Sequence, residues 1–125
     1  MLLHKELTEQ IIGGAYKVHG RLGSGFLEKV YENALTVELG KRGLAVAQQQ
    51  PIKVYYEGVV VGEYFADLLI EGKVVCELKT AECLSRHHEI QLVNYLKVTG
   101  IDTGLLINFA DKVTVRRKFR RSGGL

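Results

Sequence analysis

The sequence has only two cysteines and one proline, no tryptophan, and no long apolar run. Cys76 and Cys83 show neither CxxC spacing nor the framework of a disulfide-stapled domain, so we expect a reducing compartment and a small, buried, apolar role for Cys76. No apolar stretch approaches the roughly 20 residues that a membrane-spanning helix needs, and the N-terminal segment lacks the pattern of a secretory signal. These absences predict a cytoplasmic protein without a membrane partner.

The remaining composition is typical of one globular domain, and we expect residues 1–125 to form a single unit. Hydrophobic residues make up 46% of the chain and charged residues 25%, which is enough apolar material for a core. The net charge of +3 comes from the C-terminal segment, which contains Arg116, Arg117, Lys118, Arg120 and Arg121. Such a run predicts salt-dependent contacts with phosphates, with a solvated tail as the alternative.

Hydrophobic periodicity predicts eight elements in the order α-α-β-β-β-α-β-β. We expect helices at about residues 4–19, 25–41 and 85–99, and strands at about 46–57, 60–70, 73–79, 103–109 and 112–119. Pro51 predicts an edge position or a bulge for the first strand. This order indicates a mixed sheet flanked by helices, in the α+β or α/β class.

Asp67 and the tripeptide Glu77-Leu78-Lys79 form the clearest chemical pattern. Side chains alternate along a strand, so Glu77 and Lys79 point to the same side, about 7 Å apart. Carboxylate oxygens bind Mg²⁺, the metal polarises a phosphate and acidifies a water, and a lysine can position that water or stabilise developing charge. We therefore expect a Mg²⁺ or Mn²⁺ site suited to phosphoryl transfer. A surface ion pair is the alternative, because charged residues are common at strand ends.

The sequence around the two acids favours the metal site. Asp67 lies within Tyr64–Ile70 and Glu77 follows Val74–Cys76, and both runs are apolar on both faces, as in central strands. Unpaired acids there would be destabilising unless a metal or the lysine offset their charge. Both acids must also share one face of the sheet. A two-residue loop would separate them, so we expect a three-residue loop, Glu71-Gly72-Lys73, pairing Ile70 with Val74 and Asp67 with Glu77, or a bulge at Asp67.

At this point the chain resembles a known family. The segment from Gly25 to Tyr31 resembles the GxxExxY signature of the bacterial GxxExxY proteins, which are placed in the PD-(D/E)XK nuclease superfamily. The resemblance continues through Tyr64–Leu69, Glu77–Lys79 and Gln91–Tyr95, and covers residues from about 5 to 118. It implies a restriction-endonuclease-like αβββαβ core, here with an extra N-terminal helix. Ala66 stands where the superfamily name has proline.

The resemblance also implies roles for individual residues. It makes Asp67 and Glu77 metal ligands, with Glu28 helping directly or through water, and Lys79 the catalytic lysine. Gln91 and Tyr95 match a QxxxY pair that helps position the substrate or the active-site water. For Gln91 the alternative is a solvated helix position, and for Tyr95 it is core packing.

Two further residues are expected near the site from their positions. Tyr31 lies three residues after Glu28 on the same helix face, which predicts substrate contact, with core packing and a satisfied hydroxyl as the alternative. His19 lies nine residues before Glu28, across the glycine-rich turn, and could approach the site. Arg116, Arg117 and Lys118 are the expected phosphate contacts of the basic run.

The pattern as a whole predicts a Mg²⁺- or Mn²⁺-dependent nuclease that hydrolyses nucleic-acid phosphodiesters, with DNA favoured over RNA. A second hypothesis is a module that binds nucleic acid or protein without cutting, on an inherited nuclease fold. A third is a homodimer in which the second copy completes the substrate groove.

Overall fold

The computed structural model describes residues 4–120. In this part of the chain, the elements are α1 (Lys5–Leu22), α2 (Glu28–Lys41), β1 (Val46–Tyr56), β2 (Val59–Ile70), β3 (Val74–Lys79), α3 (Arg86–Thr99), β4 (Thr103–Phe109) and β5 (Val113–Phe119). The predicted order of elements is confirmed. The second helix begins at Glu28 instead of residue 25, because Gly25 has φ of +100°, which no α-helix accommodates.

The five strands form one mixed sheet in the order β1-β2-β3-β4-β5. Strands β3 and β4 are parallel, and the other neighbouring pairs are antiparallel. A parallel pair needs a crossover connection, and α3 provides it. The burial of Val74–Cys76 in β3 confirms the central strand predicted there, and all seven residues of β4 are buried as well. For the run around Asp67 the prediction is wrong in part, because Tyr64 and Phe65 are 46% and 48% exposed where β2 continues beyond the core.

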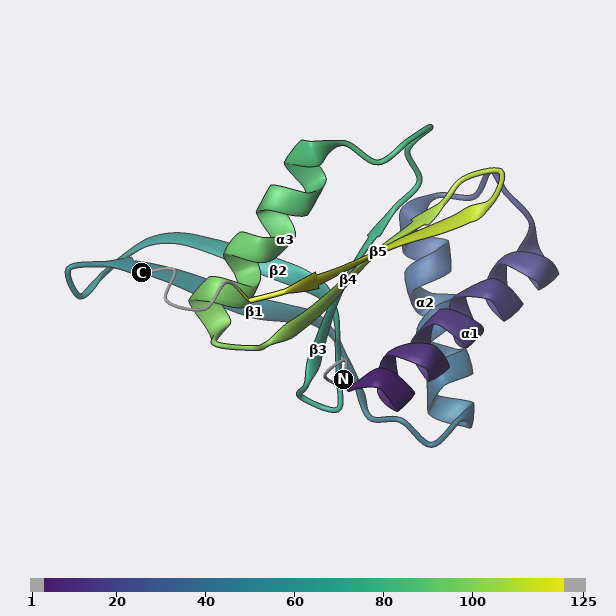
Figure 1. Cartoon of the computed structure of the whole chain (residues 1–125), viewed down its shortest axis with the longest axis horizontal. Coiled ribbons are helices and arrows are strands. Elements are labelled where there is room, and N and C mark those ends of the chain that lie inside the picture. The colour runs from purple at the N-terminus through teal and green to yellow at the C-terminus, as the bar shows by residue number, and fades with distance from the viewer. Residues whose placement is uncertain (1–3, 121–125) are drawn as a thin grey trace.

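Helices cover both faces of the sheet (Figure 1). On one face, α1 and α2 pack on the larger apolar cluster, which includes Ile11, Leu35 and Leu78. On the other face, α3 packs on a smaller cluster through Leu92 and Leu96. The fold therefore has three layers, and the predicted α+β class with an additional N-terminal helix is confirmed. None of the three helices within residues 4–120 is long and apolar enough to cross a membrane.

Local signals set the ends of α3, the helix that carries Gln91 and Tyr95. Ser85 caps its first turn, with the Ser85 Oγ accepting from the His88 backbone N at 3.3 Å and His88 Nδ1 accepting from the Ser85 backbone N at 3.2 Å. Gly100, at φ of +74°, ends the helix in the left-handed conformation that favours glycine. The two caps therefore set the first and last residues of α3.

The pairing of β2 with β3 confirms the predicted register. Ile70 pairs with Val74 across a three-residue loop, and the regular ladder ends at the pair Leu68–Cys76. The next residues along the two strands are Asp67 and Glu77, so the strands separate at the two predicted acids.

The strand β2 also changes face at Asp67. Ala66 packs in the cluster beside α3, whereas Leu68 packs in the cluster beside α1 and α2. Residues two apart in a regular strand share a face, so the alternation is broken between them. Gln49 is the β1 residue opposite Asp67, is skipped in the pairing, and has φ of +52°. The irregularity therefore lies at the candidate site.

Strand β1 lies at one edge of the sheet, as Pro51 predicted. Beyond α3, β1 and β2 continue as a long hairpin that projects from the body of the protein (Figure 1). We call residues 53–65 the hairpin arm. Its exposed apolar side chains include Tyr55, Tyr56, Val59, Val61 and Phe65.

Candidate active site

Asp67 and Glu77 meet where β2 and β3 separate. The Glu77 Oε2 atom accepts a hydrogen bond from the Asp67 backbone N at 2.8 Å, and Asp67 Oδ2 accepts one from the Leu78 backbone N at 2.8 Å. Each carboxylate thus replaces part of the missing ladder by binding a backbone amide of the other strand. The two predicted ligands are brought together by this exchange.

Both acids lie in a negative, desolvated environment. Glu77 is only 6% exposed, and burial together with the charge of Asp67 raises its pKa to about 8. Burial also raises the pKa of Asp67. Within residues 4–120, no lysine, arginine or histidine nitrogen lies within 4.0 Å of either carboxylate. The predicted alternative, a plain surface ion pair, does not describe these acids.

Glu28 and Lys79 are the other two charged residues predicted for the site, and they lie on α2 and β3. Glu28 is the first residue of α2, and its pKa is raised by burial and then by the charge of Asp67. Lys79 ends β3, and its charge acts in the opposite direction on the pKa values of Glu28, Asp67 and Glu77. The structure therefore brings the predicted acids and the lysine into one electrostatic unit.

This donor set fits a divalent cation, although the described residues contain no ready-made cage. Among residues 4–120, no three His, Cys, Asp or Glu side chains gather closely enough to enclose a metal ion. Asp67 and Glu77 each have one oxygen turned to a backbone amide, while Glu77 Oε1 and both Glu28 oxygens accept no hydrogen bond from residues 4–120. Hard cations such as Mg²⁺ take a few carboxylate oxygens and keep several waters, so an open set of this kind suits them.

Of the two predicted residues of α3, Tyr95 lies near the acids. Tyr95 is 7% exposed, and its pKa is raised to about 12 by burial and by the negative charges of Glu77 and Asp67. Its ring lies against Tyr64 of β2, with ring centroids 5.5 Å apart. Gln91 lies one turn earlier on α3 and lines the same groove as Tyr95. Their roles in positioning substrate or water stay predictions.

Glu32 and Gln49 also belong to the site, although the sequence analysis does not single them out. Glu32 is 3% exposed on α2, and its carboxylate accepts from Lys29 Nζ, Gln48 Nε2 and Gln49 Nε2, each at 2.8 Å. Gln49 Nε2 also lies 3.4 Å from Asp67 Oδ1. Through Glu32 and Gln49, these contacts connect α2 to Asp67, where the pairing of β1 with β2 is irregular. The only sequence signal was the helical spacing of Glu28 and Glu32.

Tyr31 and His19 are engaged inside the protein instead of in the site. Tyr31 is fully buried, stacks on Phe109 with centroids 4.6 Å apart, and donates its hydroxyl to the Gly23 carbonyl at 2.6 Å. This corrects the predicted substrate contact in favour of core packing with a satisfied hydroxyl. His19 Nε2 lies 2.8 Å from the Ala110 carbonyl and so joins α1 to the β4–β5 turn. No hydrogen bond or ion pair of residues 4–120 joins His19 to the acids.

The described residues of the C-terminal basic run differ in their partners and in their exposure. Lys118 forms an ion pair with Glu89 of α3, and Arg120 forms one with Asp102 at 2.9 Å. The Arg117 Nε atom is buried without a partner among residues 4–120, whereas Arg116 is exposed. Arg121 lies outside the described residues. Of the three predicted phosphate contacts, Arg116 is therefore the most available.

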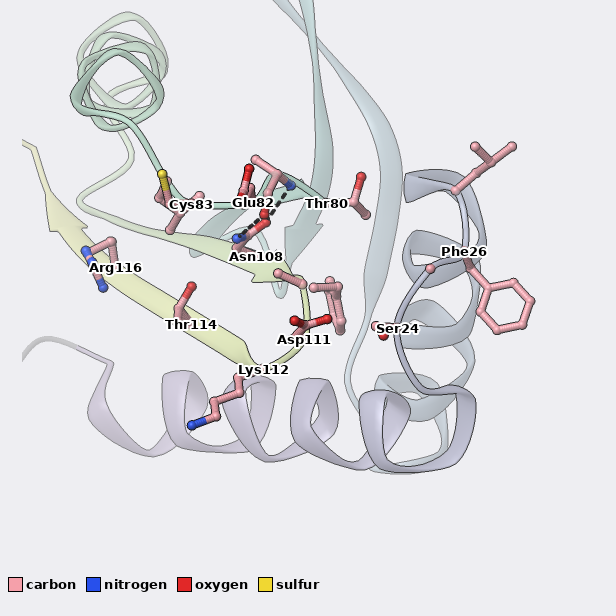
Figure 2. A pocket seen from close by; sticks show the side chains of 16 residues that line it. Ser24, Phe26, Thr80, Glu82, Cys83, Asn108, Asp111, Lys112, Thr114 and Arg116 are labelled. Carbon is pink, nitrogen blue, oxygen red and sulfur yellow. Dashed lines mark hydrogen bonds between the residues drawn. The ribbon is translucent and has the colours of Figure 1, made fainter.

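Arg116 borders a hollow of about 750 Å³ next to the site (Figure 2). The hollow lies among the loop before α2, the segment after β3 and the β4–β5 turn. Asn108 supports its floor by exchanging hydrogen bonds of 2.9 Å with the backbone N and O of Ala81. Glu82 and Asp111 also line it, so its charge is mixed. This balance does not favour an anionic ligand.

Comparisons with known proteins agree with this architecture. A family model described as the PD-(D/E)XK nuclease superfamily matches residues 5–122. The crystal structure of SSO0001 is similar, with a TM-score of 0.54 and 22% sequence identity over 94% of this chain. At that identity the likeness concerns the fold alone, and the match spans 60% of the SSO0001 chain. No curated protein matches the chain.

Proposed function

Because the chain belongs to the PD-(D/E)XK nuclease superfamily, we propose that it is a Mg²⁺- or Mn²⁺-dependent nuclease that hydrolyses nucleic-acid phosphodiester bonds, with DNA favoured over RNA. The Gly25, Glu28 and Tyr31 motif further supports membership of the GxxExxY proteins. A cytoplasmic location fits a chain in which Cys76 is buried as a free thiol.

One observation carries this proposal. Asp67 and Glu77 are drawn together by reciprocal backbone hydrogen bonds, and no cationic group of residues 4–120 lies within 4.0 Å to offset their charge. Two buried carboxylates close to each other are destabilising unless a positive charge compensates them. A divalent cation would supply that charge, and Glu28 would add further oxygens.

The residues of the site can be assigned separate tasks. When bound, a divalent cation would polarise the phosphate and lower the pKa of the attacking water. Asp67 and Glu77 would hold it, with Glu28 contributing from α2. The ammonium group of Lys79 would stabilise negative charge developing on the phosphate oxygens. Gln91 and Tyr95 would border the substrate on the α3 side.

Cleavage assays test this proposal directly. We expect the purified chain to cut single- or double-stranded DNA in Mg²⁺ or Mn²⁺ but not in EDTA. We expect Lys79→Ala to lower turnover by roughly 10²–10³-fold, because a preorganised charge aimed at the transition state is lost. Glu77→Ala should abolish metal-dependent cleavage while the circular dichroism spectrum stays unchanged.

The same assays show whether Glu77 or Lys79 has been given the wrong role. Activity that persists in Glu77→Ala would show a contaminating nuclease, and an unaltered rate in Lys79→Ala would remove the role of that lysine. Glu63→Ala, on the exposed hairpin arm, is the matched control for substitution of an acid.

A non-cutting binding module is the second candidate. It is favoured by the absence of a closed metal cage among residues 4–120, since Asp67 and Glu77 each use one oxygen on a backbone amide. Nucleic-acid binding that is equal in EDTA and in Mg²⁺, with no cleavage in any divalent metal, would establish this candidate. A homodimer that completes the groove is the third, and light scattering at several concentrations would detect it.

A further inference from the structure

Gln49 of β1 turns its side chain toward α2, against the alternation of its strand. In a regular strand, successive side chains point to opposite faces of the sheet. Gln48 and Gln49 nevertheless both donate from Nε2 to the Glu32 carboxylate of α2, each at 2.8 Å. Gln49 has φ of +52° and is skipped in the pairing of β1 with β2. The irregular backbone therefore gives Gln49 a side-chain direction that a regular strand would not.

The Glu32 carboxylate fixes the orientation of the Gln49 amide. Glu32 is 3% exposed and forms an ion pair of 2.8 Å with Lys29, whereas Gln49 is exposed. A hydrogen bond to a carboxylate is charge-assisted and roughly twice as strong as one between neutral groups, so the amide is held although water can reach it. An ionised carboxylate only accepts hydrogen bonds, so the amide nitrogen, and not the amide oxygen, faces Glu32.

The same nitrogen also faces Asp67, one of the two acids that meet between β2 and β3. Gln49 Nε2 lies 3.4 Å from Asp67 Oδ1, while Asp67 Oδ2 accepts from the Leu78 backbone N at 2.8 Å. An amide nitrogen carries two hydrogens, so one can serve Glu32 and the other Asp67. Each oxygen of Asp67 thus has its own donor, and the two donors together set the orientation of the carboxylate plane.

The length of the contact between Gln49 and Asp67 leaves room for a cation. Hydrogen bonds from N–H to oxygen are usually about 2.7–3.2 Å long, so a contact of 3.4 Å is weak. Asp67 Oδ1 accepts from no other group of residues 4–120, and a carboxylate oxygen has more than one lone pair. The amide therefore orients this oxygen and leaves it able to bind a further ligand.

We infer that Gln49 is a positioning residue, which is held by Glu32 and presents Asp67 Oδ1 to the divalent cation. This inference rests on the proposed function, and it adds Glu32 and Gln49 to the residues on which metal binding depends. Groups that hydrogen-bond to metal ligands orient them, and removal of such a group typically lowers metal affinity by roughly 10- to 100-fold.

Binding of Mn²⁺ measured without substrate tests the inference. The electron paramagnetic resonance signal of free Mn²⁺ falls as the ion binds, so a titration gives the dissociation constant. We expect Gln49→Met to raise this constant by roughly 10- to 100-fold, because methionine is unbranched and flexible but has no N–H to donate. In cleavage assays, the Mn²⁺ concentration that gives half the maximal rate should rise by the same factor, and saturating Mn²⁺ should restore the rate.

Gln48→Met is the matched control. Gln48 donates to Glu32 at 2.8 Å as Gln49 does, but its second contact is with Asn33 instead of Asp67. This variant should bind Mn²⁺ as the unaltered protein does, and urea unfolding shows whether both variants remain folded. If Gln49→Met binds Mn²⁺ as tightly as Gln48→Met, the inference is overturned.

A double-mutant cycle tests whether Glu32 acts through Gln49. Glu32→Gln alone should weaken Mn²⁺ binding, because the anchor of the Gln49 amide is lost. In the Gln49→Met background the same substitution should have a smaller effect, because the side chain that Glu32 holds no longer donates to Asp67. Equal effects in both backgrounds would show that Glu32 acts only through its charge, and would remove Glu32 from the inference.

The outcomes separate this inference from the proposed function. Mn²⁺ binding that depends on Gln49, without cleavage of any nucleic acid, would refute the nuclease and retain the positioning role. Metal-dependent cleavage, with the Mn²⁺ affinity unchanged in Gln49→Met, would retain the nuclease and refute the positioning role. If the unaltered protein binds neither Mn²⁺ nor Mg²⁺, both fail.

Discussion

At the scale of single residues, Glu77 links the site to stability. Its pKa is raised from an ordinary value of 4.5 to about 8, first by burial and then by the charge of Asp67. A carboxyl whose pKa is higher in the folded state favours folding while it is protonated, below pH 4.5, and this contribution is lost as the pH rises through about 8. The ionised form is the one that a cation would stabilise.

We therefore predict that the metal-free protein loses stability between pH 5 and pH 8, and that Glu77→Gln loses less. One titrating group contributes a slope of at most about 1.4 kcal/mol per pH unit. Urea unfolding in EDTA across this range measures it, and Mg²⁺ should reduce the loss in the unaltered protein. The exposed Glu63→Gln is the control and should follow the unaltered protein. A parallel decline in Glu77→Gln would contradict the assignment.

Gln49 shows how the backbone of one residue supports the site. Its φ of +52° lies in the left-handed region, which costs about 1–2 kcal/mol for a residue with a Cβ. The hydrogen bond of 2.8 Å to Glu32 and the contact of 3.4 Å with Asp67 accompany this conformation. The strain is thus located where β1 meets the candidate ligands.

We predict that Gln49→Gly is more stable than Gln49→Ala by about 1 kcal/mol, because both lose the amide but only glycine relieves the strain. At Gln50, which pairs regularly with Ala66, the order should be reversed, since glycine weakens an ordinary strand position. Urea denaturation of the four variants gives the comparison. The same order at both positions would show that Gln49 is not strained.

At the scale of elements, the distance between α3 and the sheet depends on Gly104 of β4. A Cβ at this position would lie 2.9 Å from Leu92 Cδ1, closer than real Cβ contacts, and 3.1 Å from Leu92 Cγ, which is a tight contact. Leu92 is fully buried and is the residue after Gln91 on α3. The glycine therefore allows α3 to approach closely enough for Tyr95 to border the acids.

We predict that Gly104→Ala destabilises the protein by about 1–3 kcal/mol, because overpacking pushes α3 away from β4. Gly20→Ala is the matched control: a Cβ there meets nothing within 4 Å, so the better helix former should raise stability by about 0.5–1 kcal/mol. Thermal or urea unfolding measures both. A neutral Gly104→Ala would show that Leu92 can rearrange without moving the helix.

The elements themselves were largely predictable from local patterns. Helical spacing of apolar residues located all three helices, and the run of Val, Ile and Tyr located β1 and β2. The predicted start of α2 is three residues too early, because the apolar stripe includes Leu27 whereas the backbone conformations of Gly25 and Leu27 are not helical. For Tyr31 the sequence leaves substrate contact and core packing both open, because spacing on a helix face cannot show that Phe109 covers the ring.

At the scale of the whole molecule, the three layers bring residues from distant segments to one place. Glu28 comes from the start of α2, Asp67 from β2, Glu77 and Lys79 from β3, and Gln91 and Tyr95 from α3. The parallel pairing of β3 with β4 forces α3 to cross over the sheet, and this crossover sets Tyr95 beside the acids.

The sequence by itself determined the order of the elements, because helices and strands depend on spacing along one segment. It also determined the β2–β3 register, because that register alone lets Asp67 and Glu77 share one face of the sheet. The tertiary structure alone decided the rest. The contact of Glu32 with Gln49, the burial of Tyr31 under Phe109 and the pairing of Lys118 with Glu89 all join residues far apart in the chain. The break in the alternation of β2 at Asp67 depends on which helices cover each face of the sheet. Such contacts depend on how layers pack, and no local spacing encodes them.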